Sequence, residues 1–254
     1  MEKELRLLAI DTSGTAGSVV VCGASGTLLA EVSATDVGTH SVWLMGAIDE
    51  ALKKAKTTID EIDYFAIGTG PGSFTGLRIG VSAIKGLAWT LKKPVIGLSV
   101  LEALAMNKEA ELTESEALIC PILDARKNEV YGALFKYEGN TLKRVTPDLA
   151  MSTGKLLELV KENGTGKKIY FLGGGLKRYA DEISSDFKET VEVDILPVEL
   201  WHLRALNISK LALGFLDKDK AGTLAGKLYD ASELLPVYLR KSEAELRRIT
   251  SKGA

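Results

Sequence analysis

The hydrophobic positions of the chain change repeatedly between strand-like runs and helix-like spacing. Residues 6–34 hold three β-rich runs separated by glycine-rich turns, which predicts a three-strand meander. In residues 39–55 the apolar side chains recur at helical spacing, with Thr39 or Ser41 as the expected N-cap. Alternating strands and helices are then predicted at residues 62–70, 73–93, 94–99 and 100–110. This order indicates βαβ units, which need parallel strands with helices on the faces of the sheet.

The same pattern begins again after an acid-rich stretch at residues 107–117. Asp11 and Asp124 each end a hydrophobic strand, and each is followed by a turn and another β-rich run. Further helices and strands are predicted at residues 153–163, 168–175, 176–183 and 201–218. We therefore predict a duplicated α/β fold with an N-terminal subdomain at residues 1–105, a C-terminal subdomain at residues 106–235 and a basic tail at residues 236–254.

Composition places the chain among ordinary globular proteins. It has 254 residues, of which 46% are hydrophobic and 26% charged, and its net charge of −2 gives no sign of a nucleic-acid binder. Cys22 and Cys120 both lie inside hydrophobic runs, which predicts buried thiols in a reducing compartment. The sequence shows no leader peptide and no apolar run near the ~20 residues of a membrane span. We therefore expect a cytoplasmic protein that does not bind membranes.

Five segments of the chain resemble, in order and spacing, the bacterial TsaB (YeaZ) family. They are AIDTSGTAGSV at residues 9–19, GTGPGSFTGLRIG at 68–80, GLSVLEALA at 97–105, LDARKNEVY at 123–131 and PVYLRKSEAE at 236–245. The most specific piece is GPGSFTGLRIG, and residues 140–230 match only loosely. The resemblance and the duplication imply two mixed-sheet α/β subdomains of the actin/hexokinase/Hsp70-like (ASKHA) fold. In that superfold two hairpins grip the phosphates of a nucleotide from opposite subdomains.

The resemblance implies a part in making threonylcarbamoyladenosine, the modified base beside the anticodon of certain tRNAs. Members of this family are not the transferase, so the chain is expected to be a catalytically degenerate subunit. The implied partners are a TsaD-like catalytic paralogue, a TsaE-like ATPase, a second copy of the chain when it is alone, and tRNA through the complex. Two alternatives remain, a small-molecule kinase or ATPase of the same superfold and, on the older glycoprotease label, a peptidase.

The glycine-rich stretch at residues 68–80 has two possible roles, phosphate binding and tight packing. A Walker-type loop would end in Lys followed by Ser or Thr, but this run ends in GLR. A dinucleotide fingerprint is also excluded, because Ser73 stands where the third glycine is needed. Gly70, Pro71 and Gly72 predict a sharp turn, and Ser73 or Thr75 can cap the helix that follows. We favour packing, although a helix N-terminus still attracts anions.

The two aspartate turns predict a degenerate nucleotide cleft. The first turn keeps small residues that could admit phosphate, whereas Arg126 and Lys127 fill the second turn, where backbone should approach the phosphates. Arg126 could instead pair with Asp124 or with another carboxylate across the cleft. Weak ATP or ADP binding is possible, and no other cofactor is expected. The candidate cleft residues are Asp11, Thr12, Ser13, Asp124, Arg126, Gly173 and Gly174.

No catalytic residue and no metal ligand is predicted. The resemblance implies that the catalytic paralogue carries an H-x-x-x-H pair on the helix after the VIGLS-like strand, where two imidazoles can hold one metal. The corresponding positions here are most plausibly Val100 and Leu104. The only histidines are His40 and His202, and the G-x-S-x-G elbow of a serine hydrolase is missing. Beside a helix start, His40 is more often a capping or surface residue than a base.

The helix predicted at residues 73–93 has apolar residues on two faces. One stripe should face the sheet, at Leu77, Val81, Ile84, Ala88 and Leu91. The opposite arc would be charged if it met only water, but it carries small and apolar residues. We therefore predict a subunit interface, although a helix of the same chain could cover this face instead. The predicted interface residues are Trp43, Ala47, Gly76, Ile79, Gly80, Ala83 and Gly86.

Overall fold

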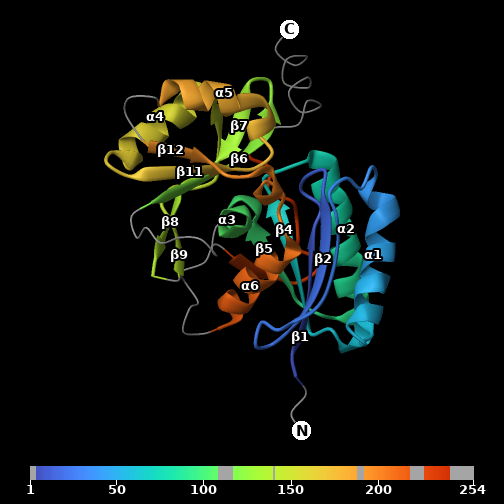
Figure 1. Cartoon of the computed structure of the whole chain (residues 1–254). Coiled ribbons are helices and arrows are strands. Elements are labelled where there is room, and N and C mark those ends of the chain that lie inside the picture. The colour runs from blue at the N-terminus through green and yellow to red at the C-terminus, as the bar shows by residue number, and fades with distance from the viewer. Residues whose placement is uncertain (1–3, 108–116, 140, 188–191, 218–225, 241–254) are drawn as a thin grey trace.

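A computed structural model describes residues 4–107, 117–139, 141–187, 192–217 and 226–240. The chain forms two lobes, each built on one β-sheet (Figure 1). We call the lobe around the N-terminal sheet the first lobe and the other the second lobe. Cys22 and Cys120 are both buried free thiols, as predicted.

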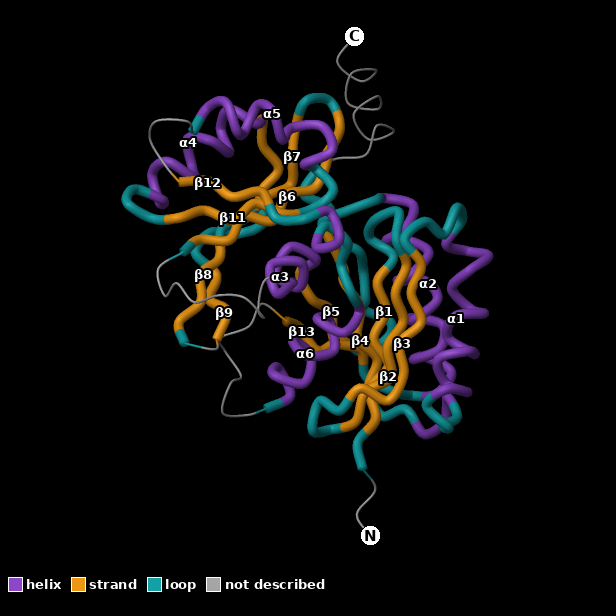
Figure 2. The backbone as a smooth tube through the Cα atoms, in the orientation of Figure 1, coloured by secondary structure: helices purple, strands orange, loops and turns teal. Residues whose placement is uncertain are grey.

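The first lobe is a six-stranded sheet with helices on both faces. Its strand order is β13-β5-β4-β1-β2-β3, in which β1–β3 form the predicted antiparallel meander and β1, β4 and β5 run parallel. Side chains alternate along β1, so that Leu8 and Ile10 pack with α1 and α2 while Leu7 and Ala9 pack with α3 and α6. Figure 2 shows α1 and α2 on one side of this sheet and α3 and α6 on the other. The elements are β1 (Arg6–Asp11), β2 (Gly17–Gly23), β3 (Leu28–Ala34), α1 (His40–Lys54), β4 (Tyr64–Gly70), α2 (Phe74–Leu91), β5 (Val95–Ser99) and α3 (Val100–Ala105).

The second lobe repeats this arrangement. Its central order β10-β7-β6-β11-β12 corresponds strand for strand to β3-β2-β1-β4-β5 of the first lobe, and β8 and β9 form an additional hairpin beside β6. This repeat confirms the predicted duplicated actin/hexokinase/Hsp70-like α/β fold. The elements are β6 (Leu118–Arg126), β7 (Glu129–Gly132), β8 (Phe135–Glu138), β9 (Thr141–Arg144), β10 (Leu149–Ser152), α4 (Thr153–Gly164), β11 (Lys168–Leu172), α5 (Leu176–Asp186) and β12 (Glu192–Ile195).

The chain returns to the first lobe after the second sheet is complete. Helix α6 (Ala205–Leu216) packs on the first sheet through Ile208, Leu211 and Ala212, and β13 (Gly226–Tyr229) pairs antiparallel with β5. This differs from the predicted boundary, which assigned residues 106–235 to the second subdomain. The physical reason is that the face of the first sheet opposite α1 and α2 needs an apolar cover, which α6 and α3 supply.

The predicted basic tail at residues 236–254 is described only as far as Arg240. Its first residues are packed between the lobes: the Val237 amide donates to the Thr69 carbonyl over 2.8 Å, and the Tyr238 ring lies on Phe74, with 4.8 Å between ring centroids. Arg240 forms an ion pair with Glu129 of the second lobe at 3.0 Å. The rest of the predicted basic tail, residues 241–254, lies outside the described residues.

The prediction for the sheet-facing side of α2 is confirmed, and the prediction for its opposite side is partly wrong. Leu77, Val81, Ile84 and Ala88 are buried against the sheet, as predicted. Gly76 and Gly80 were assigned to a subunit interface, but a methyl group on either would overlap Thr12 of the first lobe. These two glycines therefore permit close packing of α2 on the turn between β1 and β2, rather than contact with another subunit.

On α1, the two predicted interface residues have different surroundings. Ala47 is buried in the core between α1 and the sheet, so its assignment to an interface is wrong. Trp43 is half-buried and its ring lies on Gly17, where a methyl group would come within 2.5 Å of the ring. Trp43 therefore packs, at least in part, on β2 of its own chain.

Candidate functional site

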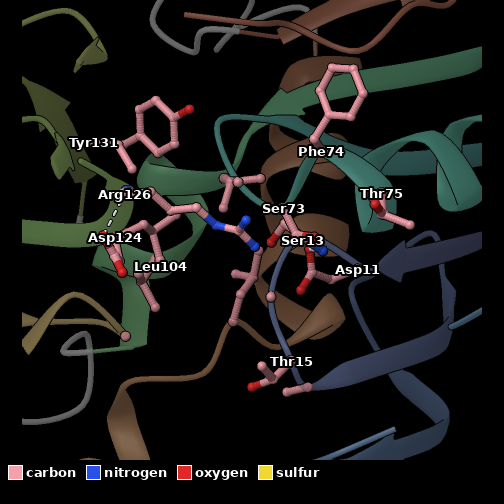
Figure 3. A pocket seen from close by; sticks show the side chains of 18 of the residues that line it. Asp11, Ser13, Thr15, Ser73, Phe74, Thr75, Leu104, Asp124, Arg126 and Tyr131 are labelled. Carbon is pink, nitrogen blue, oxygen red and sulfur yellow. Dashed lines mark hydrogen bonds between the residues drawn. The ribbon is translucent and has the colours of Figure 1, made fainter. Parts of the chain in front are cut away.

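A cavity of about 780 Å³ lies between the two lobes. Asp11, Ser13 and Ser73 approach it from one side, while Asp124, Arg126 and Tyr131 lie opposite (Figure 3). It is built where the two equivalent hairpin turns face each other, and the N-termini of α2 and α5 also open onto it. The predicted cleft therefore exists as a space bounded by both copies of the repeated unit.

The first turn supplies a buried carboxylate and small residues. The Asp11 side chain is only 2% exposed, and its Oδ1 accepts a hydrogen bond from the Ser13 amide over 3.1 Å. Burial raises the pKa of Asp11 from its ordinary value of 3.8 to about 6, although hydrogen bonds with Ser13 act against this rise. Thr12 was predicted to lie in the cleft, but its hydroxyl donates to the Gly76 carbonyl over 2.8 Å and does not line the cavity.

His40 has a structural role at the first turn. Its side chain is buried, and Nε2 lies 2.8 Å from the Gly14 carbonyl oxygen, to which it can donate. The N-cap of α1 is Thr39, so the expectation that His40 is a capping or surface residue is wrong. By holding the Gly14 carbonyl, the imidazole joins the start of α1 to the turn that lines the cavity.

The second turn has a strained backbone and two cationic side chains. Arg126, Lys127 and Asn128 have φ values of 62°, 52° and 60°, so three successive non-glycine residues adopt the left-handed region. Asp124 does contact Arg126, but through the Arg126 backbone amide, which donates to Oδ1 over 2.7 Å. Arg240 donates to the carbonyl groups of Ala125 and Arg126 and thereby supports this turn. Arg126 and Lys127 both line the cavity.

The glycine-rich stretch at residues 68–80 folds as a turn packed against protein. The Ser73 amide donates to the Ser13 carbonyl over 2.7 Å, and the Ser73 hydroxyl caps α2 by accepting from the Gly76 amide over 3.3 Å. A methyl group on Gly72 would lie 2.6 Å from the Ser13 carbonyl oxygen. The predicted cap and the predicted packing role are both supported by these contacts, while Ser73 and Thr75 still border the cavity.

The two glycines predicted near a nucleotide have different surroundings. Gly173 has a φ of 110°, and a methyl group there would overlap the Ile122 carbonyl oxygen, so this glycine is needed for the turn itself. Gly174 lines the cavity, and no atom lies within 4 Å of where its methyl group would be. Of the two, only Gly174 is placed to contact a ligand.

The inner wall of the cavity is apolar. Val100 and Leu104, on consecutive turns of α3, are 1% and 0% exposed and both line the cavity. These are the two positions at which the resemblance places the histidine pair of the catalytic paralogue. Their hydrocarbon side chains cannot bind a metal ion or accept a proton.

Two comparisons with known proteins show the family. The model of the family described as TsaD, tRNA N6-adenosine threonylcarbamoyltransferase, matches residues 27–247. The tRNA threonylcarbamoyladenosine biosynthesis protein TsaB of Bacillus subtilis (strain 168) is 33% identical over 98% of this chain and 100% of its own length. The chain belongs to the TsaB family. TsaB of Escherichia coli (strain K12) is 34% identical over 54% of this chain and 57% of its own length.

The fold of the chain is also that of a solved TsaB relative. YeaZ from Pseudomonas aeruginosa superposes with a TM-score of 0.72 at 24% identity, covering 92% of this chain and all of that one. The match to the TsaD model shows in addition that TsaB and the transferase share one domain family. Within the described part of the chain, no helix combines the length and the hydrophobicity needed to cross a membrane.

Sequence reasoning missed several cavity residues. The cleft predicted from the turns omitted Arg78 of α2, Lys177 of α5, His202 of the loop before α6, and Tyr238 and Arg240 of the tail. The segment PVYLRKSEAE contributed to the resemblance to TsaB, but the linear sequence does not show that its start crosses between the lobes. The Arg240 contact with the second turn joins segments 114 residues apart, and only the fold brings them together.

Proposed function

We propose that the chain is a non-catalytic subunit in the biosynthesis of tRNA threonylcarbamoyladenosine. Membership of the TsaB family supports the pathway. The observation that supports a non-catalytic role is that Val100 and Leu104 present only hydrocarbon to the cavity, at the positions expected for a metal-binding histidine pair. In this proposal the chain works in the cytoplasm with a TsaD-like transferase and a TsaE-like ATPase, and meets tRNA through that complex.

The isolated chain is expected to make no threonylcarbamoyladenosine from tRNA, threonine and ATP, even when the activated threonine precursor is supplied. The reason is the missing metal-binding pair on α3. The measurement is mass spectrometry of nucleosides from digested tRNA, and the positive control is the same reaction with the TsaD-like paralogue added. Modification by the chain alone, in a preparation shown to lack the paralogue, contradicts the proposal.

ATP is expected to bind the isolated chain weakly, with a Kd in the high-micromolar range or poorer, which corresponds to about −5 kcal/mol. The physical reason is that Arg126 and Lys127 occupy the second turn where the phosphates of a nucleotide would meet backbone amides. Isothermal titration calorimetry checks this value. A sub-micromolar Kd together with stoichiometric hydrolysis would instead support a kinase or ATPase of the same superfold.

The proposed partner surface is the α1–α2 outer face, which we define by Val42, Met45, Gly46, Ile79, Ala83, Gly86 and Trp89. Val42, Met45 and Trp89 are 82%, 51% and 65% exposed, and Gly46 and Gly86 have open space around them. Apolar side chains and glycines on neighbouring helices allow another helix pair to approach closely. In the proposal this face binds a second copy of the chain when it is alone and the TsaD-like paralogue in the complex.

A further inference from the structure

Another cavity, of about 600 Å³, lies at the edge of the first sheet. The end of α2 and the residues after it form one wall, and β13 with the residues after it forms the other. We call this cavity the β13 pocket and define it by Trp89, Lys92, Pro94, Leu228, Tyr229 and Asp230. It shares no residue with the cavity between the lobes, so it is a separate candidate site on the first lobe alone.

One wall of the β13 pocket carries the free edge of the first sheet. Among the described strands, β13 pairs only with β5, in an antiparallel register that places Lys227 opposite Gly97 and Tyr229 opposite Val95. On an edge strand, about every second backbone amide and carbonyl group points away from the sheet. An extended peptide can form hydrogen bonds with these groups and so add a strand to the sheet.

The walls of the pocket are largely aromatic and apolar. The Trp89 side chain is 65% exposed in the last turn of α2, and Leu228 is 46% exposed on β13. The Tyr229 ring lies on Gly97 of β5, where a methyl group would come within 2.7 Å of the ring. An apolar side chain of a bound peptide would remove this exposed surface from water, which favours binding.

Lysine side chains surround the pocket. Lys92, the C-cap of α2, is exposed and forms no ion pair with any described residue. Lys227 on β13 places its Nζ 4.7 Å from the centre of the Tyr229 ring, which belongs to the pocket wall. Lys93 also lines the pocket, but its Nζ lies 3.7 Å from a carboxylate oxygen of Asp63. The charges of Lys92 and Lys227 are therefore available for carboxylates of a ligand.

The carboxylate of the pocket is held by its own turn. Asp230 Oδ1 accepts hydrogen bonds from the amide and the hydroxyl of Ser232, over 2.9 and 2.7 Å. A second copy of the chain that paired with this edge would bring the two Lys227 side chains close together, and their charges would repel. A lysine on an edge strand thus protects against self-pairing. The same lysine attracts an acidic strand, so the charge favours an acidic partner over a second copy.

We propose that the β13 pocket docks an extended acidic segment of a protein partner, which adds a strand to the first sheet beside β13. An apolar side chain of this segment lies against Trp89. Carboxylates two residues away reach Lys92 and Lys227, because alternate side chains of a strand share one face. Trp89 also belongs to the α1–α2 outer face, so the two surfaces meet at this residue. The proposal does not rest on the role in tRNA modification, and its test needs no other component of that reaction.

Nuclear magnetic resonance of the full chain, labelled with ¹⁵N, tests the docking with three synthetic peptides. The first is a blocked peptide of about seven residues, with phenylalanine at its centre, a glutamate two residues away on each side and threonine elsewhere. It is expected to bind in the sub-millimolar range and to shift the amide signals of β13 and of the end of α2. The second carries lysine in place of glutamate and is expected to bind at least about tenfold more weakly. The third carries proline beside the phenylalanine and should weaken similarly, because it lacks backbone donors.

Charge reversal in the protein identifies the lysines. Lys92→Glu combined with Lys227→Glu is expected to weaken binding of the glutamate peptide at least about tenfold and to strengthen binding of the lysine peptide about as much. Lys56→Glu is the matched control, because Lys56 is exposed on the first lobe with a φ of 50°, close to the 53° of Lys92, but lies outside the pocket. It is expected to change the affinity less than about twofold. Trp89→Ala is expected to weaken the glutamate peptide at least about fivefold, and thermal unfolding verifies that each variant is folded.

Four results would overturn the proposal. They are no shift of the β13 signals at millimolar glutamate peptide, equal binding of the glutamate and lysine peptides, equal binding of the proline peptide, and a loss of affinity in Lys56→Glu as large as in the Lys92 and Lys227 variant. Binding of the glutamate peptide at β13 that is lost in the pocket variant, together with gain of the lysine peptide there, supports the proposal.

Discussion

Val42→Glu combined with Met45→Glu is expected to give a folded monomer that no longer binds a TsaD-like paralogue. Both side chains are exposed on α1, so their replacement removes nothing from the core. In the proposed interface, however, two carboxylates would lose their water against the apolar face of the partner. We expect the affinity for the paralogue to fall about 100-fold or more, which corresponds to about 3 kcal/mol.

The experiment compares assembly with stability in the same protein. Sedimentation velocity reports whether the variant is monomeric, calorimetric titration with the paralogue reports affinity, and thermal unfolding reports stability. Val198→Glu is the control, because Val198 is 49% exposed but lies far along the chain in a short 3-10 helix (Val198–Leu200) outside the α1–α2 outer face. Unchanged assembly by a folded Val42 and Met45 variant would show that the interface lies elsewhere.

Ile79→Glu combined with Ala83→Glu probes the same face from α2. These residues were predicted at the interface, but both are half-buried and pack against the core between the helices and the first sheet. A folded monomer that does not bind the paralogue supports the interface on α2 as well. If this variant simply unfolds, Ile79 and Ala83 belong to the internal core, and the α1 variant alone decides the matter.

Arg144→Met is expected to lower the free energy of unfolding by about 3 kcal/mol or more. Arg144 of the second lobe forms ion pairs with Glu102 at 2.6 Å and with Asp148 at 2.5 Å, and the Glu102 side chain is only 4% exposed. Ser99, at the end of β5, donates to Asp148 over 2.7 Å, so the network joins the two lobes. Removing the guanidinium would leave the buried Glu102 carboxylate without its cation.

Denaturant unfolding of the variant and its controls measures this effect. Lys136→Met breaks the ion pair with Glu138, whose side chains are 42% and 54% exposed, and is expected to cost less than about 1 kcal/mol. Glu102→Gln added to Arg144→Met is expected to recover part of the loss, because a neutral amide is less costly to bury than an unpaired carboxylate. An Arg144→Met variant as stable as Lys136→Met would show that the interlobe network contributes little.

Local patterns in the sequence determined the repeated parts of this fold. The spacing of Leu77, Val81, Ile84 and Ala88 identified the sheet-facing side of α2, because a helix brings every third or fourth residue to one face. Asp11 at the end of β1 and Asp124 near the end of β6 marked the two equivalent turns, and these turns do border one cavity. Such features depend on residues close together in the chain, so periodicity and turn chemistry are enough to recognise them.

Only the tertiary structure decided which element packs against each face of a helix or sheet. Periodicity shows that a face is apolar or small but not what lies against it, so Gly76 and Gly80 suggested a subunit interface, whereas the structure packs them on Thr12. In the same way α6 and β13 belong to the first lobe, and Arg240 reaches the second turn, through contacts between distant segments. The burial of His40 and the raised pKa of Asp11 also arise from contacts between segments that are distant in the sequence. Desolvation depends on all the neighbours in space, and the linear sequence does not place them.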